Sequence, residues 1–137
     1  QIFGEVYRLI RRKDAQHRFK DGRGWNKERG YGLVRDTLKA LRTSFGSAWG
    51  DNKNNFVTRD VTIEAMLRLC GDVAAKIDAT VMPGHELVKL LESRFKPIAE
   101  LAVEFRREGF YERFPARGQV ERVDIIRKRM ARQARFE

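Results

Sequence analysis

The sequence has little of the chemistry that builds disulfides, metal sites or membrane spans. Cys70 is the single cysteine, which excludes an internal disulfide and a zinc site made of several cysteines. The two histidines, His17 and His85, have no second His or Cys at a metal-ligand spacing. No apolar run approaches the roughly 18 residues of a membrane span, and residues 1–20 lack the apolar core of a secretion signal. We therefore expect a cytoplasmic protein that uses no metal and no cofactor.

Positive charge, by contrast, is abundant and concentrated at both ends of the chain. The 137 residues include 29 Lys or Arg and 19 Asp or Glu, a formal net charge of +10. Basic residues outnumber acidic ones by nine to four in residues 1–29 and by ten to five in residues 105–137, whereas residues 30–104 hold ten of each. A neutral centre with two basic ends is typical of a folded domain that presents cations to a polyanion, most commonly nucleic acid.

The pattern of apolar residues is helical throughout, and the chain is long enough to form one domain with a substantial core. We expect helices over residues 2–13, 31–45, 59–77 and 118–134. A further apolar stripe from Leu87 to Phe105 includes Pro97, which should kink or break the helix at Lys96 because proline removes a backbone donor. Residues 14–30 should form a basic loop, since glycines and charges interrupt the pattern there. The predicted fold is a single all-α domain of five or six helices.

The inward stripes of these helices give the predicted core. Seven residues should be mostly buried: Leu41, Phe45, Trp49, Leu67, Cys70, Phe95 and Ile98. The last helix should bury four more: Val120, Val123, Ile126 and Met130. Each of these residues lies on the apolar side of its helix or between two such stripes.

The basic ends of the chain supply the candidate nucleic-acid contacts. In the last helix the cations fall within one arc opposite the apolar stripe, at about 100° per residue. Trp25 lies among Arg23 and Lys27, a mixture of ring and cations that suits single-stranded nucleic acid or a flipped base. The candidate contacts are Arg8, Arg11, Arg12, Lys13, Arg18, Lys20, Arg23, Trp25, Arg122, Lys128, Arg129, Arg132 and Arg135. Each patch also fits a plain structural role, as a solvated helix surface or as a tryptophan that packs a loop onto the core.

No catalytic motif stands out, and we name no catalytic residue. Asp14 with His17, or His85 with Glu86, could form an acid–base pair, but such neighbours often arise by chance. The glycines of residues 22–24 lack the spacing of a phosphate-binding loop or a dinucleotide fingerprint. The sequence therefore favours a binding module over an enzyme with an unrecognised site.

An acidic protein partner is the alternative to nucleic acid. The aromatic cluster of Phe105, Phe110, Tyr111 and Phe114 would then supply apolar anchors beside the basic residues of the last third of the chain. A basic helix on a membrane surface is a weaker alternative, because the last helix has no Trp and only moderate apolar bulk. We expect no membrane partner.

Residues 25–77 resemble a known helical region. They contain Tyr31-Gly32-Leu33, Leu38, Leu41, Phe45, Ala48-Trp49-Gly50, Asn55, Thr58-Arg59, Ala65-Met66 and Leu69. This rhythm of aromatic and aliphatic residues is similar to the C-terminal helical region of DGQHR-domain proteins, a family that resembles regulators linked to DNA phosphorothioate modification and phage defence. The family's own motif belongs to an N-terminal domain; residues 14–18 match four of its five letters, but at another place in the chain.

The resemblance implies a DNA-binding module, with DNA rather than RNA as partner, from a DNA-modification or phage-defence protein. The sequence begins with Gln1 and not with Met, and an apolar segment in helical register follows at once. We therefore expect residues 1–137 to be a fragment or the C-terminal module of a larger protein.

Overall fold

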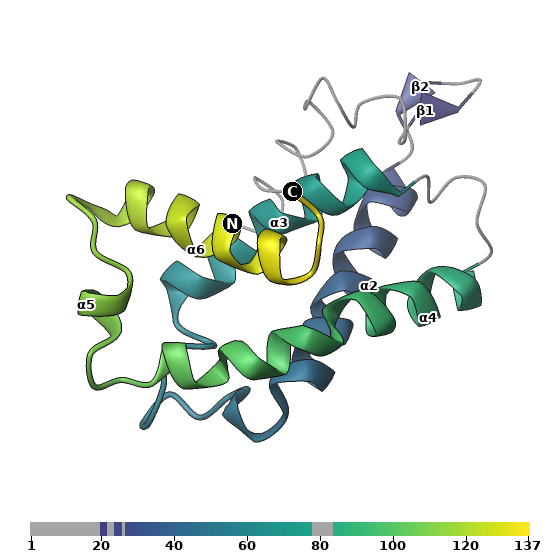
Figure 1. Ribbon diagram of the computed structural model, residues 1–137. Helices are drawn as coiled ribbons and strands as arrows, with labels where there is room; N and C mark the ends of the chain where they lie inside the picture. The colour runs from purple at the N-terminus through teal and green to yellow at the C-terminus, as the bar shows by residue number, and fades with distance from the viewer. Residues whose placement is uncertain (1–19, 22–23, 26, 78–83) are drawn as a thin grey trace.

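The computed structural model describes residues 20–21, 24–25, 27–77 and 84–137, and these residues are predominantly helical (Figure 1). The α-helices are α2 (Lys27–Phe45), α3 (Asp60–Lys76), α4 (Gly84–Phe95), α5 (Phe110–Arg113) and α6 (Gln119–Gln133), and the 3-10 helices are η2 (Gly46–Ala48) and η3 (Lys96–Phe105). Two short strands, β1 (Lys20–Asp21) and β2 (Gly24–Trp25), pair antiparallel. The all-α prediction is confirmed, while the helix expected over residues 2–13 lies outside the described residues.

The helix boundaries follow the local chemistry of the sequence. Helices α3 and α6 match the predicted helices to within one residue at each end. The break expected at Lys96 is confirmed, because α4 ends at Phe95 and η3 begins at the next residue. Pro97 has no N–H to donate to the preceding turn, and its ring crowds that turn. The predicted start of the second helix at residue 31 is wrong: α2 already begins at Lys27, because Lys, Glu and Arg form helix without any apolar pattern.

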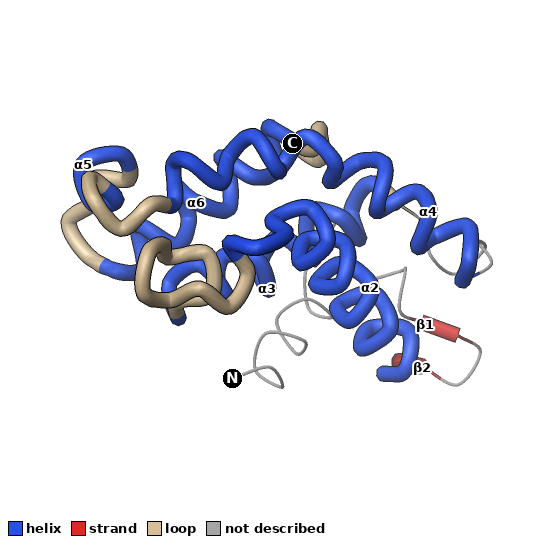
Figure 2. The backbone as a smooth tube through the Cα atoms, turned by 90° about the horizontal axis from the view of Figure 1, so that it is seen from below, coloured by secondary structure: helices blue, strands red, loops and turns tan. Residues whose placement is uncertain are grey.

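Helix α2 lies across the middle of the fold, in contact with α3, α4 and η3, while α6 packs along α3 and also touches η3 (Figures 1 and 2). Six of the seven predicted core residues are at most 4% exposed: Leu41, Phe45, Leu67, Cys70, Phe95 and Ile98. Trp49 is only partly buried, at the edge of the core. The predicted burial of Val120 is wrong, since this residue is 73% exposed, whereas Val123, Ile126 and Met130 are fully buried.

Three of the four clustered aromatic residues belong to the core. The ring of Phe105 lies 5.6 Å from that of Phe45, edge to face, and 6.1 and 5.2 Å from those of Phe110 and Phe114. Phe105, Phe110 and Phe114 are each at most 2% exposed. The prediction that Phe105, Phe110 and Phe114 anchor an external partner is therefore wrong, because these rings close one end of the core. Tyr111 differs from them and is 55% exposed.

Candidate nucleic-acid interface

The candidate residues of the basic N-terminal part fall mostly outside the described residues. This applies to Arg8, Arg11, Arg12, Lys13, Arg18 and Arg23. Lys20 and Trp25 lie in β1 and β2, where they are opposite each other in the antiparallel pair. The binding role of this part of the chain stays a prediction.

Two of the candidate cations in α6 hold neighbouring segments of the protein. The Arg122 side chain donates from Nε to the carbonyl oxygen of Phe114 at 2.9 Å and from Nη2 to that of Ala116 at 3.3 Å. Arg129 donates from Nε and Nη2 to the two carboxylate oxygens of Glu104, at 3.3 and 3.0 Å. Arg122 therefore fixes the connection between α5 and α6, and Arg129 fixes α6 to η3.

The other three candidate cations are exposed to solvent. Lys128 is 65% exposed and pairs with Asp124 at 3.0 Å, and Arg132 is 70% exposed and pairs with Glu137 at 3.6 Å. Arg135 is exposed, with a left-handed backbone at φ 61°. Exposed ion pairs contribute about 0–1 kcal/mol to stability, so Lys128 and Arg132 can exchange a carboxylate for a phosphate at little cost. The five cations therefore divide between structural and accessible positions.

Arg127 is the α6 cation that the sequence reasoning missed. Its Nη1 donates to both carboxylate oxygens of Asp72 in α3, at 2.9 and 2.8 Å, and its Nη2 donates to Asp124 at 2.7 Å. Hydrogen bonds from Arg127, and then from Lys128, hold the pKa of Asp124 below its ordinary value. Burial acts to lower the pKa of Arg127, but its hydrogen bonds to Asp124 and Asp72 outweigh burial and raise it. Arg127 therefore joins α6 to α3 and is not available to a ligand.

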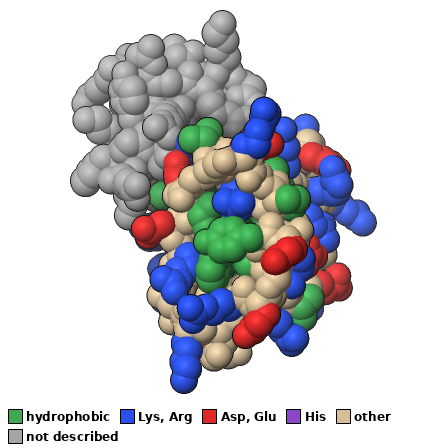
Figure 3. All heavy atoms as spheres, turned by 90° about the vertical axis from the view of Figure 1, so that its left-hand side faces the viewer, with side chains coloured by type: hydrophobic (Ala, Val, Ile, Leu, Met, Phe, Trp, Pro, Cys, Tyr) green, Lys and Arg blue, Asp and Glu red, His purple; other side chains and the backbone are tan. Residues whose placement is uncertain are grey.

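A cluster of exposed and partly buried rings and cations lies near the start of α6, around α5. We call it the α5 face, and its members are Lys53, Phe56, Arg59, Arg107, Tyr111 and Arg122. Figure 3 views the molecule from this side and shows hydrophobic side chains at the centre, with Lys and Arg around them and some Asp and Glu between. The two segments that build the face, residues 51–59 and 106–117, contain six basic and three acidic residues.

The rings and cations of the α5 face are in direct contact. The ring centre of Phe56 lies 5.6 Å from that of Tyr111, at an interplanar angle of 85°. The guanidinium carbon of Arg122 lies 4.7 Å from the ring centre of Tyr111, and that of Arg59 lies 5.5 Å from the ring centre of Phe56. Arg107 reaches the carbonyl oxygen of Lys53 from Nη1 at 3.5 Å. Edge-to-face rings and the guanidinium groups over them, next to exposed cations, suit a ligand that carries both bases and phosphates.

Backbone hydrogen bonds bring the two segments of the α5 face together. The N–H of Phe56 donates to the carbonyl oxygen of Phe105 at 2.7 Å, and the N–H of Arg107 donates to that of Asn54 at 2.9 Å. This short bridge ties the loop before α3 to the end of η3. The two segments are about 50 positions apart in the sequence, so the sequence pattern alone could not join them.

Gly109 and Arg113 set the direction of α5 and therefore the position of Tyr111. Gly109 precedes the helix with φ 77°, a left-handed conformation that glycine adopts without steric cost. The guanidinium group of Arg113 then donates to the carbonyl oxygens of Glu104, Arg106 and Glu108, at 2.8, 2.6 and 2.7 Å. These three bonds hold the turn against α5, so the Tyr111 ring is presented by a fixed scaffold.

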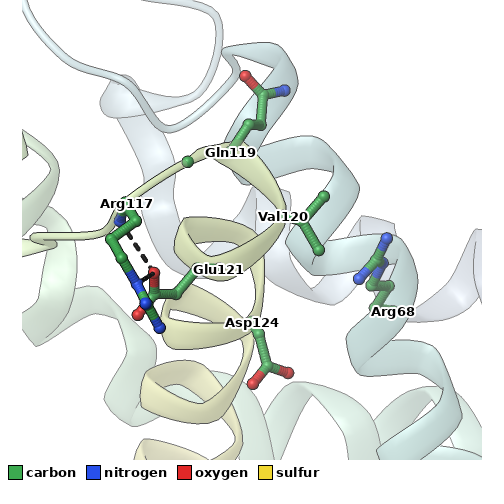
Figure 4. A pocket seen from close by; sticks show the side chains of 7 residues that line it. Arg68, Arg117, Gln119, Val120, Glu121 and Asp124 are labelled. Carbon is green, nitrogen blue, oxygen red and sulfur yellow. Dashed lines mark hydrogen bonds and ion pairs between the residues drawn. The ribbon is translucent and has the colours of Figure 1, made fainter.

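A separate cavity of about 730 Å³ opens at the start of α6 (Figure 4). Arg68 of α3 lies on one side of it, and Arg117, Glu121 and Asp124 lie on the other, with Arg117 turned toward Glu121 at 3.6 Å. Val120 faces this open space and not an apolar partner on α3, which explains its exposure. The lining has two basic and two acidic side chains, together with Gln119 and Val120.

Only one of the two candidate acid–base pairs lies in the described part of the chain. His85 and Glu86 are both exposed in the first turn of α4, and His17 with Asp14 lies outside the described residues. The part of the chain that the structure describes contains no group of three His, Cys, Asp or Glu residues that could hold a metal ion. Among its helices, none has both the length and the apolar composition needed to cross a membrane.

Comparison with known proteins gives no match to this chain, whether to family models, to curated proteins or to solved structures.

Proposed function

We propose that this protein is a non-catalytic nucleic-acid-binding module that contacts DNA through the α5 face. The observation that carries the proposal is Tyr111, an aromatic residue that is 55% exposed in direct contact with Arg122 and Phe56. Cations attract phosphates and release their counterions, while exposed rings stack on bases. The net charge of +10 supports a polyanionic partner.

In this proposal α6 has a supporting role. Arg122 and Arg129 are hydrogen-bonded to protein groups, so Arg122 contributes to the α5 face by supporting Tyr111 and not by binding a phosphate. Lys128, Arg132 and Arg135 are exposed and can add phosphate contacts around a strand bound elsewhere.

The cellular setting remains part of the proposal. The resemblance of residues 25–77 to DGQHR-domain proteins supports a role in a DNA-modification or phage-defence protein. Cys70 is a buried free thiol, which suits the reducing cytoplasm. A protein partner has weaker support than DNA, because three of the four rings expected to anchor it lie in the core.

Fluorescence anisotropy with labelled DNA oligonucleotides, single-stranded and duplex, tests the proposal. The test variant carries Lys53→Gln, Arg59→Gln and Arg107→Gln and loses three exposed cations of the α5 face. The matched control carries Lys39→Gln, Arg42→Gln and Lys89→Gln, three exposed cations of α2 and α4. Both variants have the same net charge, so they separate a local contact from a general effect of charge.

We expect the α5-face variant to bind more weakly and to reduce the slope of log affinity against log salt by about 2 to 3, while the control stays close to wild type. Thermal unfolding of both variants serves as the check on folding. An equal loss of affinity in the two variants would show that binding depends on net charge and not on the α5 face. Absence of binding to either oligonucleotide at low salt would refute the proposed function.

A further inference from the structure

We infer that the α5 face prefers single-stranded to duplex nucleic acid and stacks one base on the ring of Tyr111. This inference rests on the proposed function and adds the class of ligand. Its basis is the set of contacts around the Tyr111 ring and the exposed fraction of that residue.

The ring of Tyr111 is supported on several sides. Phe56 and Phe110 meet it edge to face, with ring centres at 5.6 and 5.4 Å and interplanar angles of 85° and 79°. The guanidinium group of Arg122 lies over it, and two backbone carbonyl oxygens fix that group in turn. Because 55% of Tyr111 is exposed in spite of these contacts, the residue offers surface to a further stacked group.

Base stacking on an exposed ring distinguishes single-stranded from duplex nucleic acid. In a duplex each base is already stacked between its neighbours, so its faces cannot reach a protein ring without unstacking at a cost of a few kcal/mol. A single strand offers its base faces at little cost, and stacking on an aromatic side chain is tolerant of sequence because every base has such a face. The α5 face therefore suits single strands and does not require base-edge recognition.

The α5 face also offers cations for the phosphates next to a stacked base. Arg59 and Arg107 are exposed and come from two segments that backbone hydrogen bonds join. Arg59 lies over the ring of Phe56, which in turn contacts Tyr111. Glu108 and Glu112 flank Tyr111 in the sequence, are also exposed and offset part of this charge. Affinity on this face should therefore depend on stacking as well as on charge.

The test replaces Tyr111 and compares a labelled single-stranded oligonucleotide with a duplex of the same sequence. Tyr111→Phe keeps the ring, whereas Tyr111→Leu keeps apolar bulk without an aromatic face. We expect wild type and Tyr111→Phe to bind the single strand more tightly than the duplex. Tyr111→Leu should lower single-strand affinity by about 5- to 150-fold, the range for loss of one stacked base. The salt slope should stay unchanged because no cation is removed.

A second measurement covers the case in which Tyr111→Leu disturbs Arg122 and lowers stability. In wild-type protein, the NMR signals of the Tyr111 ring should move on addition of the single strand, since a stacked base shields the ring protons. Tight binding with no movement of these signals would overturn the inference. Equal affinity for single strand and duplex, with no loss of affinity in Tyr111→Leu, would also overturn the inference but leave the proposed function standing. Absence of binding to both oligonucleotides would refute the inference and the proposed function together.

Discussion

Replacing Arg127 with Met should destabilise the fold much more than replacing its neighbour Lys128 with Met. The Arg127 and Asp72 side chains are 22% and 11% exposed, and the change leaves the Asp72 carboxylate between α3 and α6 without two hydrogen bonds of 2.9 and 2.8 Å. Removing one partner of a buried pair costs about 3–5 kcal/mol, and the remaining solvent exposure lowers our expectation to about 2–3 kcal/mol. The Lys128 side chain is 65% exposed, so its loss should cost about 0–1 kcal/mol.

Urea unfolding at neutral pH measures both free energies, provided that the slope with denaturant stays constant. Adding Asp72→Asn to Arg127→Met should recover part of the loss, because the interface then no longer holds a carboxylate that has lost its hydrogen bonds to Arg127. The cycle should give a coupling energy of about 0.5–3 kcal/mol. The reasoning is refuted if Arg127→Met and Lys128→Met lose the same stability, or if Arg127→Met loses less than about 1 kcal/mol.

Three further changes test the acid sensitivity, the turn and the core. Because the pKa of Asp124 is lowered, its carboxylate stabilises the fold above its ordinary pKa of 3.8, and this stability is lost as the pH falls through the lowered pKa. Urea unfolding across this pH range should show a smaller loss of stability for Asp124→Asn than for wild type. Equal losses would contradict this role of Asp124. In Gly109→Ala the new Cβ would lie 2.7 Å from Nη1 of Arg113 at φ 77°, so unfolding should show a loss of at least about 1 kcal/mol, and unchanged stability would rule out this turn. Phe95→Ala removes a fully buried ring and should lower the free energy of unfolding by about 3–5 kcal/mol, more than Trp49→Ala at the edge of the core. A loss below about 1 kcal/mol for Phe95→Ala would contradict the helical register.

The fold was largely predictable because most helices have local causes. Helices α3 and α6 carry unbroken apolar stripes, and the break after Phe95 follows from the covalent structure of Pro97. The start of α2 was missed because its first residues have helix propensity but no apolar periodicity. Val120 lies on the apolar stripe of α6, but the stripe could not show that α3 provides no partner there.

The candidate site was less predictable because its parts meet through distant contacts. The sequence identified basic residues but not their partners: Arg127 and Asp72 are 55 positions apart, and Arg129 and Glu104 are 25 apart. Tyr111 was grouped with three phenylalanines that are buried. The one signal that set it apart was its hydroxyl group, which favours a ring with one side in water.

The most direct test of the α5 face is to map where nucleic acid lies on the wild-type protein. A single-stranded oligonucleotide with 5-bromouracil, which crosslinks to nearby aromatic residues under ultraviolet light, is bound at low salt, irradiated and digested with trypsin. We predict crosslinks in the peptide of residues 108–113, which contains Tyr111, and in that of residues 54–59, which contains Phe56. Crosslinks confined to peptides of α6 or of residues 1–29 would contradict the assignment of the α5 face as the binding surface.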